Sequence, residues 1–360
     1  MKDASDPQAI LFEDALAQTA KNVRHLLIGN GFSIAARPSF TYRSLARAAR
    51  LSEPLRALFA QTDDFELVLL GLRDRIADPM ITAADLSTMK EQEEEVREGF
   101  VDALQTVHPE HSMKMGEVEC DRCATFLEEF VGRSRTLKLA GRVYTTNYDL
   151  LLYWVVARSG RRLWCYDSHF NDDPDPHKRK LYGIWKPDSG PMRARPPELV
   201  YLHGALHTYD AANGAQGMLR SGRRKNLIDQ SRARLAKGNF PVIVAEGTSE
   251  AKASRISRSK YLTWATGWLA KGMRHPNAVL FTHGHSLDLR DAHLLKHVGN
   301  GRISAVYVGA WGGLEGDQAA AIRNWNSCWQ GVRPQQHPLR VYVYDTSLVS
   351  PWKYPLKGER

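Results

Sequence analysis

Residues 25–35 read His25-Leu26-Leu27-Ile28-Gly29-Asn30-Gly31-Phe32-Ser33-Ile34-Ala35. A short apolar run followed by two closely spaced glycines and a hydroxyl residue is typical of a buried strand, a tight turn and the start of a helix. Gly29 and Gly31 would permit positive φ angles and let the backbone approach a ligand. Amide groups at the helix start would then face an anion, which the helix dipole favours. The stretch predicts a phosphate-binding turn.

The turn lacks two features that phosphate-binding motifs have. A dinucleotide fingerprint has a third glycine, where this chain has Ile34, and no Walker-type lysine follows. An ordinary tight turn is therefore the alternative. Only motifs later in the chain can distinguish a phosphate-binding turn from an ordinary tight turn.

Composition and charge limit the class of protein. The 360 residues carry a formal net charge of +9, which favours an anionic partner such as a nucleotide, a nucleic acid or a phosphorylated ligand. The four cysteines are too few for a disulfide framework. No apolar run is long enough to cross a membrane, and the first residues lack the apolar stretch of a signal peptide. We therefore expect a cytoplasmic protein without a membrane partner.

Basic clusters lie at residues 158–162, 178–180 and 220–225. They are not interleaved with aromatic residues, as a surface that stacks on bases would be. Solvated protein faces are the simpler explanation, and nucleic acid is the less favoured partner.

Helical and strand-like segments alternate along most of the chain. Strands are predicted at 142–146, 199–202, 241–244, 278–282, 303–308 and 339–344, and helices at 8–24, 44–61, 259–271, 290–298 and 316–329. This alternation predicts an α/β fold, with a mostly parallel sheet flanked by helices and residues 1–360 in one domain. Residues 64–138 show long helical patterns and predict a helical insertion.

Two pairs of metal-ligating residue types lie within this insertion. His108 and His111 precede Cys120 and Cys123, and both pairs have a two-residue spacer. The gap between the pairs is shorter than in common zinc fingers, and the cysteines also fit one face of a helix. Buried free cysteines are the favoured interpretation over zinc, and we expect no metal cofactor.

Four predicted strands or turns end in polar or glycine residues. These ends are Gly29-Asn30-Gly31, Thr146-Asn147-Tyr148-Asp149, His203-Gly204 and Gly284-His285-Ser286. In an open parallel sheet, ligands bind in the crevice beyond the carboxyl ends of the strands. We therefore expect these four segments to converge on one cleft of nucleotide size.

The same four segments resemble the sirtuin-type NAD-binding fold, in the version found in bacterial NAD-cleaving proteins of antiphage defence. Gly29 to Ser33 is similar to the family's Gly-Ala-Gly-x-Ser turn, 146–149 to its Gln-Asn-Ile-Asp segment, and 284–287 to its Gly-Thr-Ser segment. Leu202-His203-Gly204 resembles its catalytic His-Gly. An uncharacterised bacterial domain-of-unknown-function family that combines Gly-Asn-Gly-Phe-Ser, Thr-Asn-Tyr-Asp, Leu-His-Gly and Glu-Gly-Thr-Ser is more similar still. Residues 205–283 contain no cysteine, so the four-cysteine zinc module of sirtuins is absent and protein deacylation is not expected.

The resemblance implies catalytic roles for Asn147, His203 and Asp149. His203 would hydrogen-bond a ribose hydroxyl or act as general base, with a structural histidine as the alternative. Asn147 would hold a water or the nicotinamide amide, with a simple Asn turn as the alternative. Asp149 would orient ligand groups or only cap the next helix. The cofactor-binding residues it implies are Gly29, Asn30, Gly31, Phe32, Ser33, Thr146, Gly204, Gly284, His285 and Ser286.

Five further side chains each have a functional and a structural interpretation. Glu246 and Lys252 either line the cleft or form a surface ion pair. His283 and His285 flank Gly284 and should point to opposite sides of the strand end, so at most one should face the ligand. For His25 a structural role is favoured.

The resemblance implies an NAD hydrolase that releases nicotinamide and ADP-ribose, regulated and used in antiphage defence, with NAD as its ligand and with a homo-oligomer or a defence protein as a possible partner. The alternative is a sensor that binds NAD or an ADP-ribose derivative without turning it over. A nucleic-acid-binding protein is the third hypothesis, and steep salt dependence of binding would support it.

Overall fold

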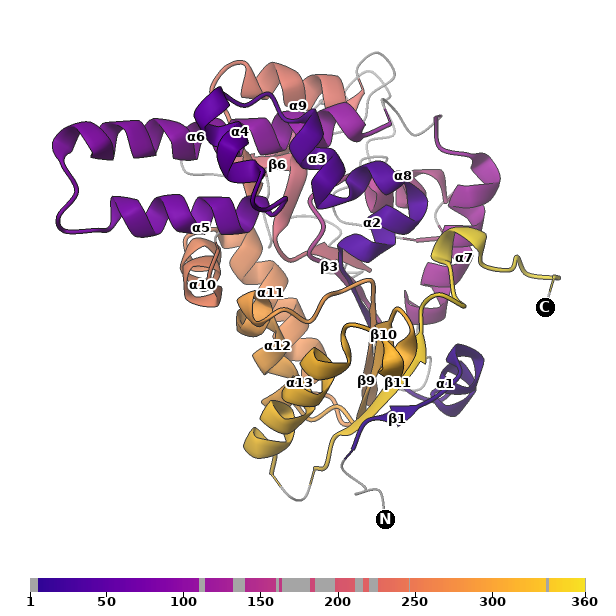
Figure 1. Cartoon of the computed structure of the whole chain (residues 1–360). Helices are drawn as coiled ribbons and strands as arrows, with labels where there is room; N and C mark the ends of the chain where they lie inside the picture. Colours follow the sequence, from indigo (N-terminus) through magenta and orange to yellow (C-terminus); the bar gives the residue numbers. More distant parts are fainter. Residues whose placement is uncertain are drawn as a thin grey trace.

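The centre of the fold is a seven-stranded sheet in which every pairing is parallel (Figure 1). The structure is a computed structural model that describes residues 6–109, 114–131, 140–159, 162–163, 182–184, 198–210, 216–219, 226–245, 247–334 and 337–359. The strand order is β1 (Gln8–Ala9), β11 (Arg340–Asp345), β10 (Ala305–Ala310), β9 (Ala278–His283), β2 (Val23–Ile28), β3 (Val143–Thr145) and β5 (Leu199–Tyr201). The predicted α/β fold with a mostly parallel sheet is confirmed.

The strand order reverses between β2 and β9. From β2 the chain moves outward through β3 and β5, then crosses to the other side of β2 and moves outward through β9, β10 and β11. Ile28 and His283 pair at the carboxyl ends of β2 and β9. This is a Rossmann-like arrangement, in which ligands bind beyond the strand ends at the reversal.

Helices cover both faces of this sheet. Leu26 and Ile28 of β2 join an apolar cluster with α7 and α8, whereas Leu27 joins a second cluster with α11, α12 and α13. Successive side chains of a strand point to opposite faces, so burial on both faces explains the unbroken apolar run of β2. The helices of the described residues are α1 (Phe12–Gln18), α2 (Asn30–Ala36), α3 (Tyr42–Ala48), α4 (Glu53–Phe59), α5 (Phe65–Ile76), α6 (Ala83–Val107), α7 (Glu117–Val131), α8 (Leu151–Arg158), α9 (Leu227–Leu235), α10 (Ser249–Ser257), α11 (Lys260–Met273), α12 (Ala292–Gly299) and α13 (Ala319–Val332).

A second sheet is antiparallel and was not foreseen. Its order is β4 (Tyr182–Ile184), β7 (Gln216–Leu219), β6 (Gly204–Asp210) and β8 (Pro241–Ile243). The predicted strand at 241–244 is present as β8, but it pairs antiparallel with β6 and lies outside the parallel sheet. Gly204 has a φ of +75° and lets the chain turn directly from β5 into β6. A Cβ there would lie 1.8 Å from the Val242 carbonyl oxygen, so β8 passes where only glycine fits.

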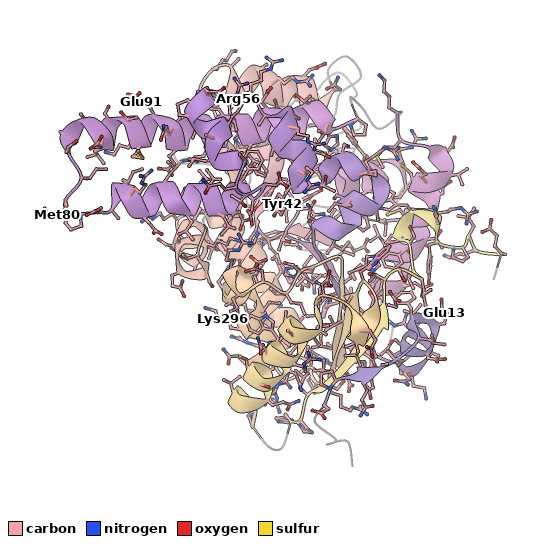
Figure 2. The ribbon with its side chains drawn as sticks, viewed as in Figure 1. Glu13, Tyr42, Arg56, Met80, Glu91 and Lys296 are labelled. Atoms are coloured by element: carbon pink, nitrogen blue, oxygen red, sulfur yellow. The ribbon has the colours of Figure 1, made fainter. Side chains whose placement is uncertain are left out.

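Between β2 and β3, the elements of the described residues are α2, η1 (Pro38–Phe40) and α3 to α7, all of them helices. Helices α5 and α6 form an antiparallel hairpin that projects from the molecule, with Met80 at its tip (Figures 1 and 2). Helix α7 does not project in this way. It packs on β2 and β3 and is part of a helical layer of the α/β core. Among the described residues, no helix has the length and apolar character to span a bilayer.

The N-terminal segment differs from the predicted helix over 8–24. Gln8 and Ala9 pair with Tyr342 and Val343 at the edge of the sheet, so the helix begins only at Phe12. It ends at Gln18 because β2 starts soon afterwards. The predicted helix over 44–61 is two helices, α3 and α4, and Pro54 lies in the first turn of the second, where proline is tolerated.

Candidate functional site

A cavity of about 640 Å³ lies beyond the carboxyl ends of β2, β3 and β9, at the reversal of strand order. All of the predicted catalytic and cofactor-binding residues line it except Phe32, Ser33 and Gly204. Ile34, Phe40, Leu45, Phe100 and Leu104 add an apolar wall from α2, η1 (Pro38–Phe40), α3 and α6. The volume lies in the range typical of small-molecule sites. The predicted convergence of the four segments is therefore present in the structure.

The glycine turn after β2 packs against the glycine turn after β9. The Gly29 and Gly31 amides donate to the carbonyls of His283 and Gly284, at 3.2 and 2.9 Å. Neither Gly29 nor Gly31 has a positive φ, so that part of the prediction is wrong. A Cβ on Gly29 would lie 2.6 Å from the Cα of His285. These glycines are required by the contact between two turns, and their amides are not free to bind an anion.

Gly284 carries the largest constraint in this contact. Its φ is +64°, and a Cβ there would lie 2.4 Å from the backbone nitrogen of Phe32. We expect Gly284→Ala to lower the free energy of unfolding by about 2–3 kcal/mol, from the left-handed backbone and the contact together. Gly267→Ala in α11 is the matched control, because nothing lies within 4 Å of its Cβ, and it should be neutral or stabilising by about 0.5–1 kcal/mol. Urea unfolding measures both, and equal stabilities of the two variants would contradict the expectation.

A buried hydrogen-bonded chain fixes the loop after β3. The Asn147 Nδ2 donates to the Ser33 Oγ at 2.8 Å, and the Ser33 Oγ donates to the Asp149 Oδ2 at 2.6 Å. Asp149 Oδ1 also accepts from the Leu151 amide, at the first residue of α8, at 2.8 Å. Burial raises the pKa of Asp149, although the Ser33 and Leu151 hydrogen bonds oppose it. Asp149 thus both binds the start of α8 and lines the cavity, whereas Ser33 holds the loop and does not line the cavity.

Two other predicted residues are structural in this fold. Phe32 is fully buried, and its carbonyl accepts from the Trp352 Nε1 at 2.9 Å. Gly204 lies at the turn into β6. Asn30 does line the cavity, but its Nδ2 donates to the Phe40 carbonyl at 3.1 Å.

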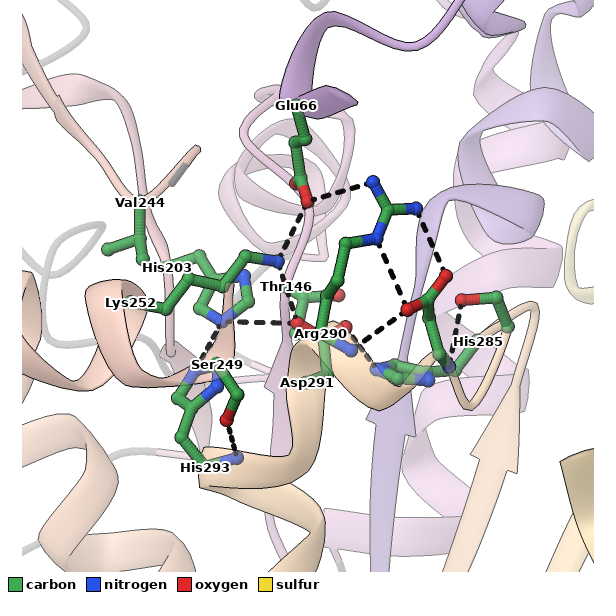
Figure 3. Close-up of polar contacts among 12 residues, drawn as sticks. Glu66, Thr146, His203, Val244, Ser249, Lys252, His285, Arg290, Asp291 and His293 are labelled. Atoms are coloured by element: carbon green, nitrogen blue, oxygen red, sulfur yellow. Dashed lines mark hydrogen bonds and ion pairs between the residues drawn. The ribbon is translucent and has the colours of Figure 1, made fainter. Parts of the chain in front are cut away.

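His203 lies at the base of the cavity beside a second histidine that the sequence did not reveal. The Nε2 atoms of His203 and His293 are 3.0 Å apart, and His203 Nε2 is 3.9 Å from Asp291 Oδ1 (Figure 3). Burial lowers the pKa of His203 well below its ordinary value and that of His293 to about 4, against the opposing charge of Asp291. Both imidazoles are therefore neutral at pH 7.

Lys252 lies in this cluster and not on the surface. Its Nζ is 2.9 Å from both Glu66 Oε2 and Asp291 Oδ1, and the residue is 2% exposed (Figure 3). Burial acts to lower the pKa of Lys252, but the two carboxylates outweigh it and raise the pKa. Burial likewise opposes ionisation of Asp291, but the hydrogen bond with His285 and the charge of Lys252 hold its pKa well below the ordinary value. For Glu66, burial dominates and raises the pKa.

Arg290 joins the cavity wall to the helical hairpin. It is 2.8 Å from Asp64, 3.0 Å from Asp288 and 3.7 Å from Glu66. Asp64 and Glu66 lie at the start of α5, whereas Arg290 and Asp288 follow β9. Ion pairs thus connect the helical region to the α/β core at the cavity.

Both histidines that flank Gly284 line the cavity, so the expectation that at most one of them faces it is wrong, although their surroundings differ. His285 Nδ1 accepts from the Leu287 amide at 3.0 Å, and its Nε2 is 3.4 Å from Asp291 Oδ2. The His283 ring instead packs against Phe126, and its Nδ1 is 3.2 Å from the Tyr344 hydroxyl. His25 is also buried and accepts from the Arg142 amide. The structural role favoured for His25 is confirmed.

Of the four residues considered as zinc ligands, the three that the structure describes make hydrogen bonds or pack in the hydrophobic core. His108 Nε2 accepts from the Leu150 amide at 2.9 Å, and its Nδ1 is 3.1 Å from the Pro109 carbonyl. Cys120 and Cys123 are buried on α7 in the hydrophobic core. His111 and Glu246 lie outside the described residues.

Sequence reasoning missed Glu66, Arg290, Asp291 and His293 as members of the site. Glu66 lay in the predicted helical insertion, and the other three lay in a helix considered only as covering the sheet. The signal that was available is the dense polar run His285-Ser286-Leu287-Asp288-Leu289-Arg290-Asp291 directly after a strand end.

One comparison with known proteins identifies a family that covers most of the chain. No curated protein matches the chain. The sequence model of a family described as a domain of unknown function (DUF4917) matches residues 26–352. This range includes every strand of the parallel sheet except β1 and part of β2, together with all of the cavity residues named above. The protein belongs to the DUF4917 family.

Proposed function

We propose that this protein binds NAD in the cavity at the strand reversal and hydrolyses the bond between nicotinamide and ribose. Water adds at the ribose carbon as that bond breaks, so the products are nicotinamide, ADP-ribose and a proton. The observation that carries the proposal is the convergence of Gly31, Asn147, His203 and Gly284 on one cavity of about 640 Å³. The resemblance to sirtuin-like NAD-cleaving proteins suggests the ligand, and a role in antiphage defence rests on that resemblance alone.

Asn147 supplies the most specific support. The residue is 5% exposed and lines the cavity, and its Oδ1 has no hydrogen-bond partner. A buried carbonyl oxygen without a donor costs about 1–3 kcal/mol, so a ligand that offers an N–H or O–H group is favoured. The nicotinamide amide, a ribose hydroxyl and a water all offer one. His203, neutral and buried in the same wall, would position a ribose hydroxyl.

A sensor that binds NAD without cleaving it is the second candidate. His203 Nε2 already lies 3.0 Å from His293 Nε2, and burial lowers its pKa well below the ordinary value. A weakly basic imidazole with an engaged nitrogen is a poor general base. This observation favours binding over turnover, and the experiment below separates the two.

The test is release of nicotinamide from NAD by purified, tag-free protein, followed by chromatography. We expect Asn147→Ala and His203→Ala to reduce release by roughly 100-fold, because each removes a group that positions the reacting atoms. His25→Asn is the matched control, since His25 is equally buried but lies outside the cavity. It should retain activity while its melting temperature reports any loss of folding.

Calorimetric titration with NAD completes the test. Binding without release by the wild-type protein would replace the hydrolase with the sensor. Absence of saturable NAD binding would contradict both candidates.

A further inference from the structure

We infer that His203, His293 and Asp291 form a binding site for a divalent first-row transition metal ion in the wall of the cavity. His203 follows β5, whereas Asp291 and His293 lie two residues apart, at the end of η4 (Leu289–Asp291) and in the first turn of α12. Figure 3 shows their side chains directed toward one another. Each can present one ligand atom, and these atoms all lie within 4.8 Å of one another.

The spacing of the donor atoms fits a metal ion. Nitrogen ligands lie about 2.0–2.1 Å from a metal such as zinc, so two of them at a right angle are about 3.0 Å apart. The Nε2 atoms of His203 and His293 are 3.0 Å apart. Asp291 Oδ1 is 3.9 Å from His203 Nε2, so a small movement of the carboxylate completes a three-ligand set.

The charges around the trio favour an added cation. The ion-paired network contains two cations, Lys252 and Arg290, and four carboxylates, which belong to Asp64, Glu66, Asp288 and Asp291. The formal charge of these six ion-paired side chains is therefore −2. Lys252, Glu66 and Asp291 are each less than a tenth exposed, where uncompensated charge is unfavourable. A divalent ion between the imidazoles would balance it.

The donor set indicates which ions fit. Two imidazoles and one carboxylate suit zinc, iron, nickel or manganese better than magnesium or calcium, which prefer oxygen ligands. Lys252 and His285 contact the two oxygens of Asp291, and such contacts typically orient a metal-binding carboxylate. His203 and Asp291 line the cavity, so a water or a ligand oxygen could occupy an open position.

This site is different from the paired histidines and cysteines at 108–123, and it replaces the expectation that no metal is bound. The competing explanation is a direct hydrogen bond between the two imidazoles, because an N–H···N bond also gives about 3.0 Å. Metal binding distinguishes the two explanations. The inference requires no NAD cleavage, so it stands or fails independently of the proposed function.

The experiment is titration of tag-free, chelator-treated full-length protein with Zn²⁺ by calorimetry and with Co²⁺ by visible absorption, without NAD. We expect one equivalent to bind, and a cobalt absorption spectrum typical of nitrogen and oxygen ligands. His203→Ala and His293→Ala should each weaken binding at least tenfold. His25→Asn, which alters a buried histidine outside the trio, should bind as the wild type does.

Melting curves show whether each variant is folded. If His293→Ala does not fold, His293→Gln replaces it, because glutamine retains a hydrogen-bonding side chain but is a poor ligand for these ions. Absence of saturable binding by the wild type, or binding that neither histidine substitution weakens, would overturn the inference in favour of the hydrogen bond.

Discussion

Replacement of Lys252 by methionine is expected to lower the free energy of unfolding by about 3–5 kcal/mol, which is the effect of removing one partner from a buried ion pair. Lys252 lies between Glu66 and Asp291, 2.9 Å from each, and its side chain is 3% exposed. Methionine fills a similar volume but leaves two carboxylates without their shared cation. Most of the expected loss is the cost of keeping the Glu66 and Asp291 carboxylates buried without this cation.

Urea unfolding of the two proteins at pH 7 measures this loss. Lys296→Met on α12 is the matched control, because Lys296 is exposed and a surface substitution should change stability by no more than about 0.5 kcal/mol. The double variant Lys252→Met with Glu66→Gln should regain part of the loss, since it removes one of the unpaired carboxylates. A Lys252→Met protein as stable as the wild type would show that the ion pairs are not buried as described.

The architecture could be predicted because apolar runs such as Leu26 to Ile28 carry their own signal. Strands buried on both faces are continuously apolar, and their alternation with helices indicates a parallel sheet. The antiparallel sheet was not predictable in this way. Strand β8 looks like the other strands in sequence, and its pairing is set by the turn at Gly204, which depends on contacts with Val242.

The residues at strand ends were found for the same topological reason. Parallel strands bring Gly31, Asn147, His203 and Gly284 to one edge of the sheet whatever the loops between them contain. Their individual contacts did not follow from the pattern. The sequence around Gly29 and Gly31 predicts a phosphate-binding turn. In the structure these glycines instead allow the turns after β2 and β9 to pack closely together.

The charged residues of the site could not be predicted from the sequence for a different reason. Glu66 and Lys252 are separated by about half of the chain and lie on helices whose sequences contain many charged residues. Nothing in such a helix distinguishes a buried charge from a solvated one, because burial depends on where α5 and α10 pack. The same holds for His293, which becomes notable only beside His203.

Acidification is expected to destabilise the protein steeply between pH 7 and pH 5. Burial lowers the pKa of His25 and His108 to about 3 and that of His283 to about 4. In the unfolded chain these histidines titrate near pH 6.5. Between the two pKa values the unfolded state binds protons that the native state excludes, so stability is present above pH 6.5 and is lost as the pH falls.

Each of the three histidines should contribute a loss of about 2 kcal/mol at pH 5, or about 6 kcal/mol together, against a typical net stability of about 5–15 kcal/mol. Urea unfolding at several pH values between 7 and 5 measures this slope. His25→Asn should remove about 2 kcal/mol of the loss at pH 5, because asparagine does not titrate. Thr282→Val on the neighbouring strand removes a buried hydroxyl that accepts from the Gly309 amide, and it should lower stability equally at every pH. Parallel stability curves for His25→Asn and the wild type would contradict this account, since the pH dependence would then come from groups other than the buried histidines.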